Sequence, residues 1–296
     1  MGVELSSEAV IGVIGGSGVY AIDGLENTRW ETVDSSFGAP SDQLLVGDLT
    51  GQKLVFLPRH GRGHRLSPSD INYRANIDAM KRMGVTDILS VSAVGSLKQE
   101  YAPGTFVLVD QFIDRTFARQ KSFFGTGCVA HVSMAHPVSD RLRAALAEAC
   151  DELGFNYALG GTYLVMEGPQ FSSQAESELY RSWGCDVIGM TNMPEAKLAR
   201  EAEIPYATIA MVTDYDCWHP DHDHVTVEAV VKVLLANAEH ARSLVKAVAP
   251  KLRQRPEVDS QGGDRALDHA LITHADARDP AVVAKLDAVA GRVLTD

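Results

Sequence analysis

Short apolar runs that alternate with helix-like segments constrain the fold of this chain more than any other feature. The predicted strands cover residues 10–14, 44–46, 54–57, 87–94, 106–109, 163–166, 187–190 and 206–212. The predicted helices cover residues 69–83, 139–153, 194–203, 226–248 and 280–294. Strands separated by helices over most of a chain predict an α/β fold with a largely parallel core sheet.

Length and composition place the chain among ordinary globular proteins. It has 296 residues, of which 45% are hydrophobic and 22% charged, enough for one or two domains. The net charge is −12 and no block is rich in Lys and Arg, which disfavours binding to nucleic acid or to a membrane surface. A phosphate ligand would therefore need a local basic pocket.

The sequence also predicts where the protein resides and how it is divided. No apolar run approaches the length of a membrane span, and the N-terminus lacks the basic start of a signal peptide, so we expect a cytoplasmic protein. The four scattered cysteines are then expected to be buried thiols and not disulfides. Residues 1–252 are expected to form the domain, and 253–296 a polar linker followed by a helical extension.

Three segments that follow predicted strands carry groups suited to an anion. Gly15-Gly16-Ser17-Gly18 offers backbone N–H groups and a hydroxyl, Arg59-His60 offers a guanidinium, and 92–96 is a run of small residues. Strand ends are where α/β sheets bind ligands. Taken singly, each segment has a simpler interpretation: a tight turn, a surface pair, or close packing of strand and helix.

Two further strand ends carry acids. Asp214 and Asp216 follow the strand 206–212, and carboxylates there are costly to bury without a polar ligand. The segment 167–173 (EGPQFSS) joins an acid and an aromatic ring beside a helix start, which suits a nucleobase. The simpler interpretation of 167–173 is a loop with Ser172 or Ser173 as the helix cap.

A histidine-rich stretch follows the second aspartate. Residues 217–224 (CWHPDHDH) hold three His, one Cys and two Asp, but their spacing matches no known zinc pattern. We interpret 219–224 as a solvated loop and expect no metal.

Seven separated blocks, in this order, resemble the S-methyl-5′-thioadenosine phosphorylases of the trimeric purine nucleoside phosphorylase family. The blocks are GVIGGSGVY at 12–20, LPRHGRGHRLSPSDINYRANI at 57–77, SAVGSL at 92–97, DQFIDRT at 110–116, GGTYLVMEGPQFSSQAES at 160–177, WGCDVIGMTNMPEAKLA at 183–199 and YATIAMVTDYDCW at 206–218. The resemblance spans about residues 10–250.

The resemblance implies a single α/β domain with a mixed, partly barrel-like central sheet flanked by helices, assembled as a homotrimer. It implies phosphorolysis without a cofactor, in which inorganic phosphate is the co-substrate. Phosphate displaces adenine from methylthioadenosine and gives 5-methylthioribose 1-phosphate.

The resemblance also implies roles for individual residues. The phosphate-binding set would be Ser17, Arg59, His60, Ser92, Ala93 and Thr191. The substrate-binding set would be Met190 at the ribose, Phe171 and Ser172 at the base, Val227 and Val230 at the methylthio group, and His131 from the neighbouring subunit. The catalytic residues would be Asp214 and Asp216. The family usually has Thr at position 17 and often at 92, and Ser keeps the hydroxyl at both.

Elementary chemistry agrees with a role for the aspartates. A departing purine needs a proton, with N7 as the expected site, and a carboxylic acid can donate it if burial and a neighbouring carboxylate raise its pKa. A carboxylate also accepts from the exocyclic amine of adenine, whereas a 6-oxo purine would favour an amide. Asp214 therefore favours adenine.

Three alternatives stay open on the sequence alone. The nearest is a phosphorylase of the same fold that acts on methylthioinosine, inosine or guanosine. A nicotinamide-dependent oxidoreductase would need a third glycine after Gly16 and Gly18, which is missing. A non-catalytic nucleoside-binding module would have no need of the phosphate-binding set.

Overall fold

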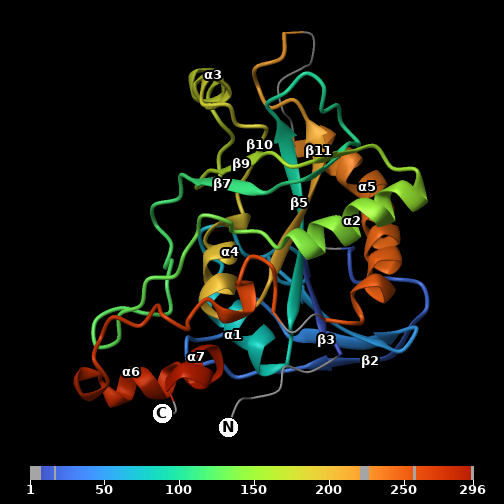
Figure 1. Cartoon of the computed structure of the whole chain (residues 1–296). Helices are drawn as coiled ribbons and strands as arrows, with labels where there is room; N and C mark the ends of the chain where they lie inside the picture. Colours follow the sequence, from blue (N-terminus) through green and yellow to red (C-terminus); the bar gives the residue numbers. More distant parts are fainter. Residues whose placement is uncertain (1–7, 17, 221–226, 256–257, 295–296) are drawn as a thin grey trace.

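The chain, described by a computed structural model, forms one mixed sheet with helices on both faces (Figure 1). The structure describes residues 8–16, 18–220, 227–255 and 258–294, except the side chains of 227–236. The strands are β1 (Ile11–Gly15), β2 (Leu25–Glu31), β3 (Leu44–Leu49), β4 (Gln52–Pro58), β5 (Asp87–Ser96), β6 (Phe106–Leu108), β7 (Gln111–Asp114), β8 (Tyr157–Leu159), β9 (Thr162–Val165), β10 (Val187–Gly189) and β11 (Tyr206–Asp214). The helices are α1 (Tyr73–Arg82), α2 (Asp140–Leu153), α3 (Gln174–Ser182), α4 (Asn192–Glu201), α5 (Val227–Val248), α6 (Pro280–Lys285) and α7 (Asp287–Leu294). The predicted α/β class with a mixed central sheet is confirmed.

The centre of the sheet is parallel, as its apolar strands predict. β1 lies between β4 and β5, and β5 also pairs with β11, all in parallel register. At its far end β5 pairs antiparallel with β10, through Gly95 and Ser96. The sheet therefore branches at β5, into β10, β9 and β7 on one side and β11, β6 and β8 on the other.

One hairpin was predicted and one strand was missed at the sheet edge. β3 and β4 pair antiparallel around Thr50 and Gly51, both at positive φ, which suits the right-handed twist of a two-residue hairpin. β2 extends this edge, and most of its residues are exposed. Its sequence, LENTRWE, lacks the apolar run used to predict strands.

Helix ends follow capping residues, with one shift from the prediction. α2 runs from the side-chain cap Ser139 to Gly154 in the left-handed conformation, both as predicted. α1 starts later than the predicted residue 69, because the side chain of Asn72 caps it by accepting from the N–H of Ala75. The residues before Asn72 form a turn.

The predicted last helix, 280–294, is two helices. Asp279 caps α6 as predicted, but the chain breaks at Leu286 before α7 begins. The Leu286 side chain is fully buried in the apolar core. At the break, the N–H of Leu286 donates to the carbonyl of Val283 at 3.0 Å, an i to i−3 bond that ends α6.

Two apolar layers hold the helices against the sheet. One core joins the sheet to α1, α4 and α7, with members Ile77, Met80, Leu198 and Val289. The other joins it to α2 and α5, with members Leu142, Leu146, Leu244 and Val245. Figure 1 shows α2 and α5 running together on one side of the sheet, with α1 and α4 on the other.

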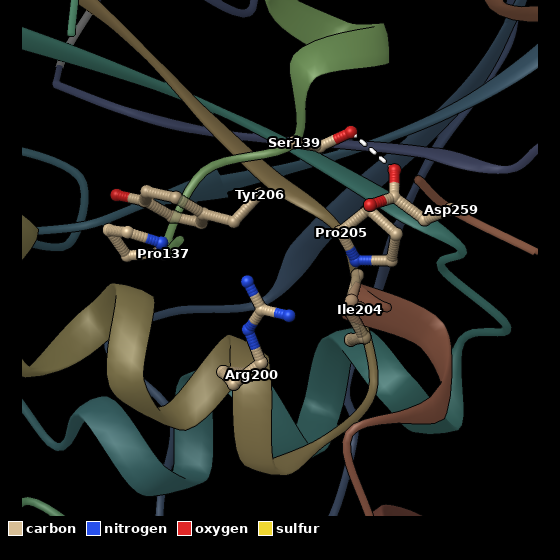
Figure 2. Close-up of a pocket in the computed structure, with 8 residues that line it drawn as sticks. Pro137, Ser139, Arg200, Ile204, Pro205, Tyr206 and Asp259 are labelled. Atoms are coloured by element: carbon tan, nitrogen blue, oxygen red, sulfur yellow. Dashed lines mark hydrogen bonds between the residues drawn. The ribbon is translucent and has the colours of Figure 1, made fainter. Parts of the chain in front are cut away.

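The polar segment after residue 252 is anchored on the domain. Buried Asp259 accepts a hydrogen bond from Ser139 at 2.5 Å, and Arg200 points into the same small cavity (Figure 2). Further on, Arg292 pairs with Glu203 at 2.5 Å. These contacts fix the tail to α2 and α4, while a domain boundary at 252 stays a prediction.

Two smaller expectations concern thiols and membranes. Cys128, Cys150 and Cys185 are buried and Cys217 is half-buried, all as free thiols, in agreement with the prediction. In the described ranges, no helix has the length and apolarity needed to cross a membrane.

Candidate active site

Three neighbouring strand ends bring the predicted phosphate-binding segments together. In the register of the sheet, Ile14 of β1 lies opposite Leu57 of β4 and Ser90 of β5. Because the three strands are parallel, the segments that follow them emerge at one edge. Arg59 follows β4 there, and its backbone N–H donates to the carbonyl of Gly15 at 2.9 Å. Ser17 itself lies outside the described residues.

The guanidinium of Arg59 is buried beneath this edge and held on most sides. Its Nε donates to Glu195 at 2.7 Å and its Nη2 donates to the same carboxylate at 3.0 Å. Nη2 also donates to Ser90 Oγ at 2.5 Å, and Nη1 donates to the carbonyl of Val91 at 3.0 Å. Burial alone would lower the pKa of Arg59, but Glu195 raises it. The paired edge of the guanidinium thus faces Glu195, and within the described residues one Nη1 proton has no acceptor.

His60, the next residue, is held as a neutral ring. Its pKa is lowered to about 4, most of all by burial and also by Arg59, against a hydrogen bond to the carbonyl of Leu66. That bond joins Nδ1 to the Leu66 oxygen at 2.9 Å, and a carbonyl can only accept, so the proton of the neutral ring is on Nδ1. His64 stacks on the ring with centroids 4.1 Å apart. Nε2 is left as an acceptor.

Ser92 and Thr191 face each other across the same edge. Their hydroxyl oxygens are 3.2 Å apart, and Ser92 Oγ is 3.0 Å from the Tyr163 hydroxyl. Ser92 and Ala93 lie in β5, opposite Ala210 and Met211 of β11. Thr191 is buried at the start of α4, and its side chain makes no capping bond. Its hydroxyl is therefore available to a ligand.

The residues predicted to bind the base lie on a loop that folds against β10. The loop follows β9 and contains the cis peptide Gly168–Pro169. A methyl group added at Gly168 would meet Met190 Sδ at 2.5 Å, so only glycine admits Met190 there. Phe171, on the same loop, is 43% exposed, as expected for a ring that stacks on a ligand. Ser173, with a full capping box, starts α3, which confirms the helix-cap interpretation of this residue.

The two aspartates close the other side of this region. Cys217 Sγ lies 3.4 Å from the carbonyl of Ser172, which joins the base loop to the end of β11. Asp214 accepts from the Thr213 hydroxyl at 2.7 Å and from the N–H of Asp216 at 2.8 Å. Its Oδ1 would lie 2.9 Å from a methyl group at Gly95, so this glycine admits the carboxyl.

Both aspartates favour the protonated form more than a free carboxyl does. Burial raises the pKa of Asp214, against the hydrogen bonds from Thr213 and Asp216. The pKa of Asp216 is raised to about 6, most of all by burial and also by the neighbouring Asp214. Asp216 also holds a positive φ of 51°. The site thus contains two neighbouring carboxyls whose pKa values are both raised by burial, which favours proton donation.

Two charged residues of this region were not identified from the sequence. Glu195 pairs with Arg59, and Arg119 forms a buried pair with Glu167, Nε to Oε1 at 3.2 Å. Glu195 lies inside the predicted helix 194–203, at a position that must face the sheet, and this was an available signal. Arg119 lies in an irregular segment whose sequence carries no comparable pattern.

The structure does not place the three residues predicted for the 5′ pocket, Val227, Val230 and His131, beside the rest of the candidate site. The side chains of Val227 and Val230 lie outside the described residues, although both belong to α5. His131 is exposed and lines a separate cavity of about 410 Å³ with Phe124, Met134, Lys121 and Lys197. Of the predicted site residues, His131 alone lines that cavity.

Residues of the histidine-rich stretch fall partly outside the structure as well. Residues 221–226 lie outside the described ranges. Among the residues that are described, no three His, Cys, Asp or Glu side chains come together as metal ligands would.

Comparison with curated proteins finds close relatives over nearly the whole chain. The S-methyl-5′-thioadenosine phosphorylase of Rhodospirillum rubrum is 68% identical over 291 residues, which cover 98% of this chain and 99% of the relative. The protein of the same name from Koribacter versatilis is 52% identical over 285 residues, 96% of this chain and 97% of the relative.

Solved structures give the same result. A methylthioadenosine phosphorylase from an antarctic soil metagenomic library is 43% identical, with a TM-score of 0.87 over 96% of this chain and 99% of that one. The methylthioadenosine phosphorylase of Schistosoma mansoni, in complex with adenine, is 36% identical, with a TM-score of 0.76 over 82% of this chain and 91% of that one. The sequence profile of the phosphorylase superfamily matches residues 10–250. With these relatives and this arrangement of strand ends, the chain belongs to the phosphorylase superfamily.

Proposed function

We propose that this enzyme catalyses the phosphorolysis of S-methyl-5′-thioadenosine, with inorganic phosphate as the second substrate. The products are adenine and 5-methylthioribose 1-phosphate, as in salvage of purines and of the methylthio group. The observation that carries the proposal is one sheet edge that holds both an anion-binding set and a pair of protonatable carboxyls. The names of the close relatives support the choice of substrate.

Phosphate binds where the ends of β4, β1 and β5 meet. Ser17, Ser92 and Thr191 donate hydroxyls, the buried guanidinium of Arg59 contributes positive charge, and the backbone at Ala93 completes the set. Because Glu195 fixes Arg59, little reorganisation accompanies binding, and the gain comes from positioning and fixed charge.

His60 selects the protonation state of the phosphate. With its proton on Nδ1, the neutral ring offers Nε2 as an acceptor, which suits the hydroxyl of HPO₄²⁻. Over one turnover this phosphate proton is lost and adenine gains one, so the overall reaction needs no external acid or base.

Phosphate attacks C1′ of the ribose as the bond from C1′ to N9 breaks. Positive charge develops on the sugar and is met by the phosphate beneath it, while negative charge develops on the purine. Burial raises the pKa of Asp214, which favours its acid form, and this acid donates a proton to N7. Asp216 accepts a hydrogen bond from the exocyclic amine, which a 6-oxo purine lacks.

The nucleoside is held by apolar contacts around these polar ones. Phe171 stacks on the base, Ser172 lies at its polar edge, and Met190 packs on the ribose. Val227 and Val230 line the 5′ pocket, where a thioether is preferred over a hydroxyl. His131 of a neighbouring subunit completes that pocket in a homotrimer, and no cofactor or metal takes part.

Steady-state rates with four nucleosides test the proposed substrate. We expect kcat/KM to be highest for methylthioadenosine, lower for adenosine, and lowest for methylthioinosine and inosine. A preference for inosine or methylthioinosine would instead establish the 6-oxo purine phosphorylase considered above. Size-exclusion chromatography with light scattering tests the trimer: a monomer at micromolar concentration would exclude the role of His131.

A further inference from the structure

Arg119 is a buried arginine that none of the roles above uses. It lies after β7, and its side chain is 1% exposed. Its three nitrogens donate to the Tyr73 hydroxyl at 3.1 Å, to the carbonyls of Met190 and Met193 at 2.6 Å each, to the carbonyls of Met166 at 3.5 Å and Glu167 at 2.6 Å, and to the Glu167 carboxylate at 3.2 Å. A buried arginine this fully bonded fixes the groups around it, because any movement of them would leave a charged donor unpaired.

The acceptors belong to two segments on opposite sides of the site. Nη1 holds the carbonyls of Met190 and Met193, on either side of the phosphate-binding residue Thr191. Nη2 holds the carbonyls of Met166 and Glu167, where the base-binding loop begins. The guanidinium is planar and rigid, so these two nitrogens set the distance between the two segments.

Glu167 locks the arginine in place from the other side. Its Oε2 accepts from the N–H groups of Phe117 at 2.6 Å and Ala118 at 3.2 Å, and its Oε1 accepts from Ser69 and Arg119. Burial raises the pKa of Glu167, but these hydrogen bonds and Arg119 lower it to about 2. The carboxylate therefore stays ionised. Through it, the segment 117–119 is bonded to the start of the loop 166–172.

We infer that Arg119 is a positioning residue that sets the separation between the phosphate-binding turn 190–193 and the base-binding loop 166–172. This inference rests on the proposed function, since it assumes that the two segments hold the two substrates. In a reaction between two bound molecules, an error of about 1 Å in their separation costs on the order of 10²-fold in rate. In this role Arg119 acts on the two segments through their backbone carbonyls, while the Tyr73 hydroxyl and the Glu167 carboxylate hold its guanidinium in place.

The variants Arg119→Lys and Arg119→Ala test this role by steady-state kinetics in both substrates. Lysine keeps the charge but cannot span both segments, so we expect kcat to fall about 10- to 100-fold, with KM raised for phosphate and for the nucleoside alike. In Arg119→Ala, millimolar guanidinium should restore part of kcat. A residue that only stabilises the fold would show no such recovery of kcat. Tyr73→Phe, which removes one acceptor and keeps the ring, should lower kcat by about two- to fivefold.

Arg82 supplies the matched control. It also forms two ion pairs, with Asp78 at 2.8 Å and with Asp287, but at the far end of α1. Arg82→Met should lower the melting temperature and leave kcat and both KM values unchanged. If both Arg119 variants fail to fold, Tyr73→Phe decides the question.

The variants separate failure of the inference about Arg119 from failure of the proposed placement of the substrates. If Arg119→Lys folds with kcat and both KM values within twofold of wild type, or if Tyr73→Phe alone is available and unchanged, the inference is overturned. If instead Phe171→Ala leaves the nucleoside KM unchanged and Ser92→Ala leaves the phosphate KM unchanged, the proposed placement of the substrates fails first.

Discussion

The two halves of the site are built by opposite means. On the proposed phosphate side, Arg59 and Glu195 are buried and form an ion pair at 2.7 Å. On the base side, Phe171 is 43% exposed, and burial raises the pKa of both Asp214 and Asp216. One half holds a buried ion pair between the end of β4 and helix α4, and the other holds carboxyls with raised pKa values at the end of β11 and just after it.

The difference follows from what each half does in the reaction. Phosphate must be held in one place throughout, and fixed dipoles and charges do this without reorganisation. The leaving base must receive a proton, so a carboxyl there has to exist in its protonated form. The comparison predicts large stability effects for variants on the phosphate side and large effects on rate or pH dependence on the base side.

The largest effect is expected from Glu195→Ala, which leaves the buried charge of Arg59 without a partner. Removing one member of a buried pair costs about 3–5 kcal/mol in the free energy of unfolding. Urea denaturation at pH 7.5 measures it, with the exposed partner of Lys251, Glu148, as the control. Glu148→Ala should cost no more than about 1 kcal/mol. An equal loss of unfolding free energy in Glu195→Ala and Glu148→Ala would mean that the buried pair contributes no more to stability than the exposed one.

The next effect separates rate from stability. Asp214→Asn keeps the shape of the side chain but has no acidic proton, so we expect kcat with methylthioadenosine to fall by roughly 10²-fold or more. The melting temperature should not fall, because a buried carboxyl with a raised pKa is replaced by a neutral amide. Turnover at the wild-type rate would remove Asp214 from the mechanism.

For Asp216, the expected effect on the free energy of unfolding depends on pH. Its pKa of about 6 in the folded state lies above the ordinary 3.8, so the folded state binds the proton more tightly than the unfolded state. The stability linked to this proton is complete below pH 3.8 and is lost as the pH rises through 6. Asp216→Asn should therefore raise the free energy of unfolding by about 2–3 kcal/mol at pH 8 and by almost nothing at pH 4. A gain of the same size at both pH values would contradict the raised pKa.

The smallest effect concerns the exposed ring. Phe171→Ala should raise KM for the nucleoside about tenfold, as loss of one stacking contact does, with KM for phosphate unchanged. Trp183, which is 44% exposed and caps the far end of α3, gives the control. Trp183→Ala should leave both KM values as they are. A shift in phosphate KM with Phe171→Ala would mean that the two halves are not independent.

Much of the fold was predictable because local rules agreed with the tertiary structure. The apolar runs became β1, β5 and β11, and Ser139 and Gly154 mark the ends of α2 as capping rules require. β2 was missed because an exposed edge strand needs no apolar pattern. The break at Leu286 was missed because it depends on where the tail packs, which local spacing does not encode.

The strand-end residues of the candidate site could be predicted from the sequence, but the residues that hold them in place could not. Strand-end segments such as Arg59 and Asp214 stand out in a sequence, because parallel strands end at a common edge. Their partners Glu195 and Thr213 act through contacts that only the folded chain creates. Arg119 is the extreme case, since most of its acceptors are backbone carbonyls, which leave no trace in residue identity.

The most direct test of the central claim is the release of adenine from methylthioadenosine by the purified enzyme, with and without inorganic phosphate. The account predicts adenine and 5-methylthioribose 1-phosphate in equal amounts when phosphate is present, and almost no adenine when it is removed. Asp214→Asn should reduce both products together. Adenine released at the same rate without phosphate would contradict the account, because the sheet edge at Arg59 and Ser92 would then bind something other than the attacking group.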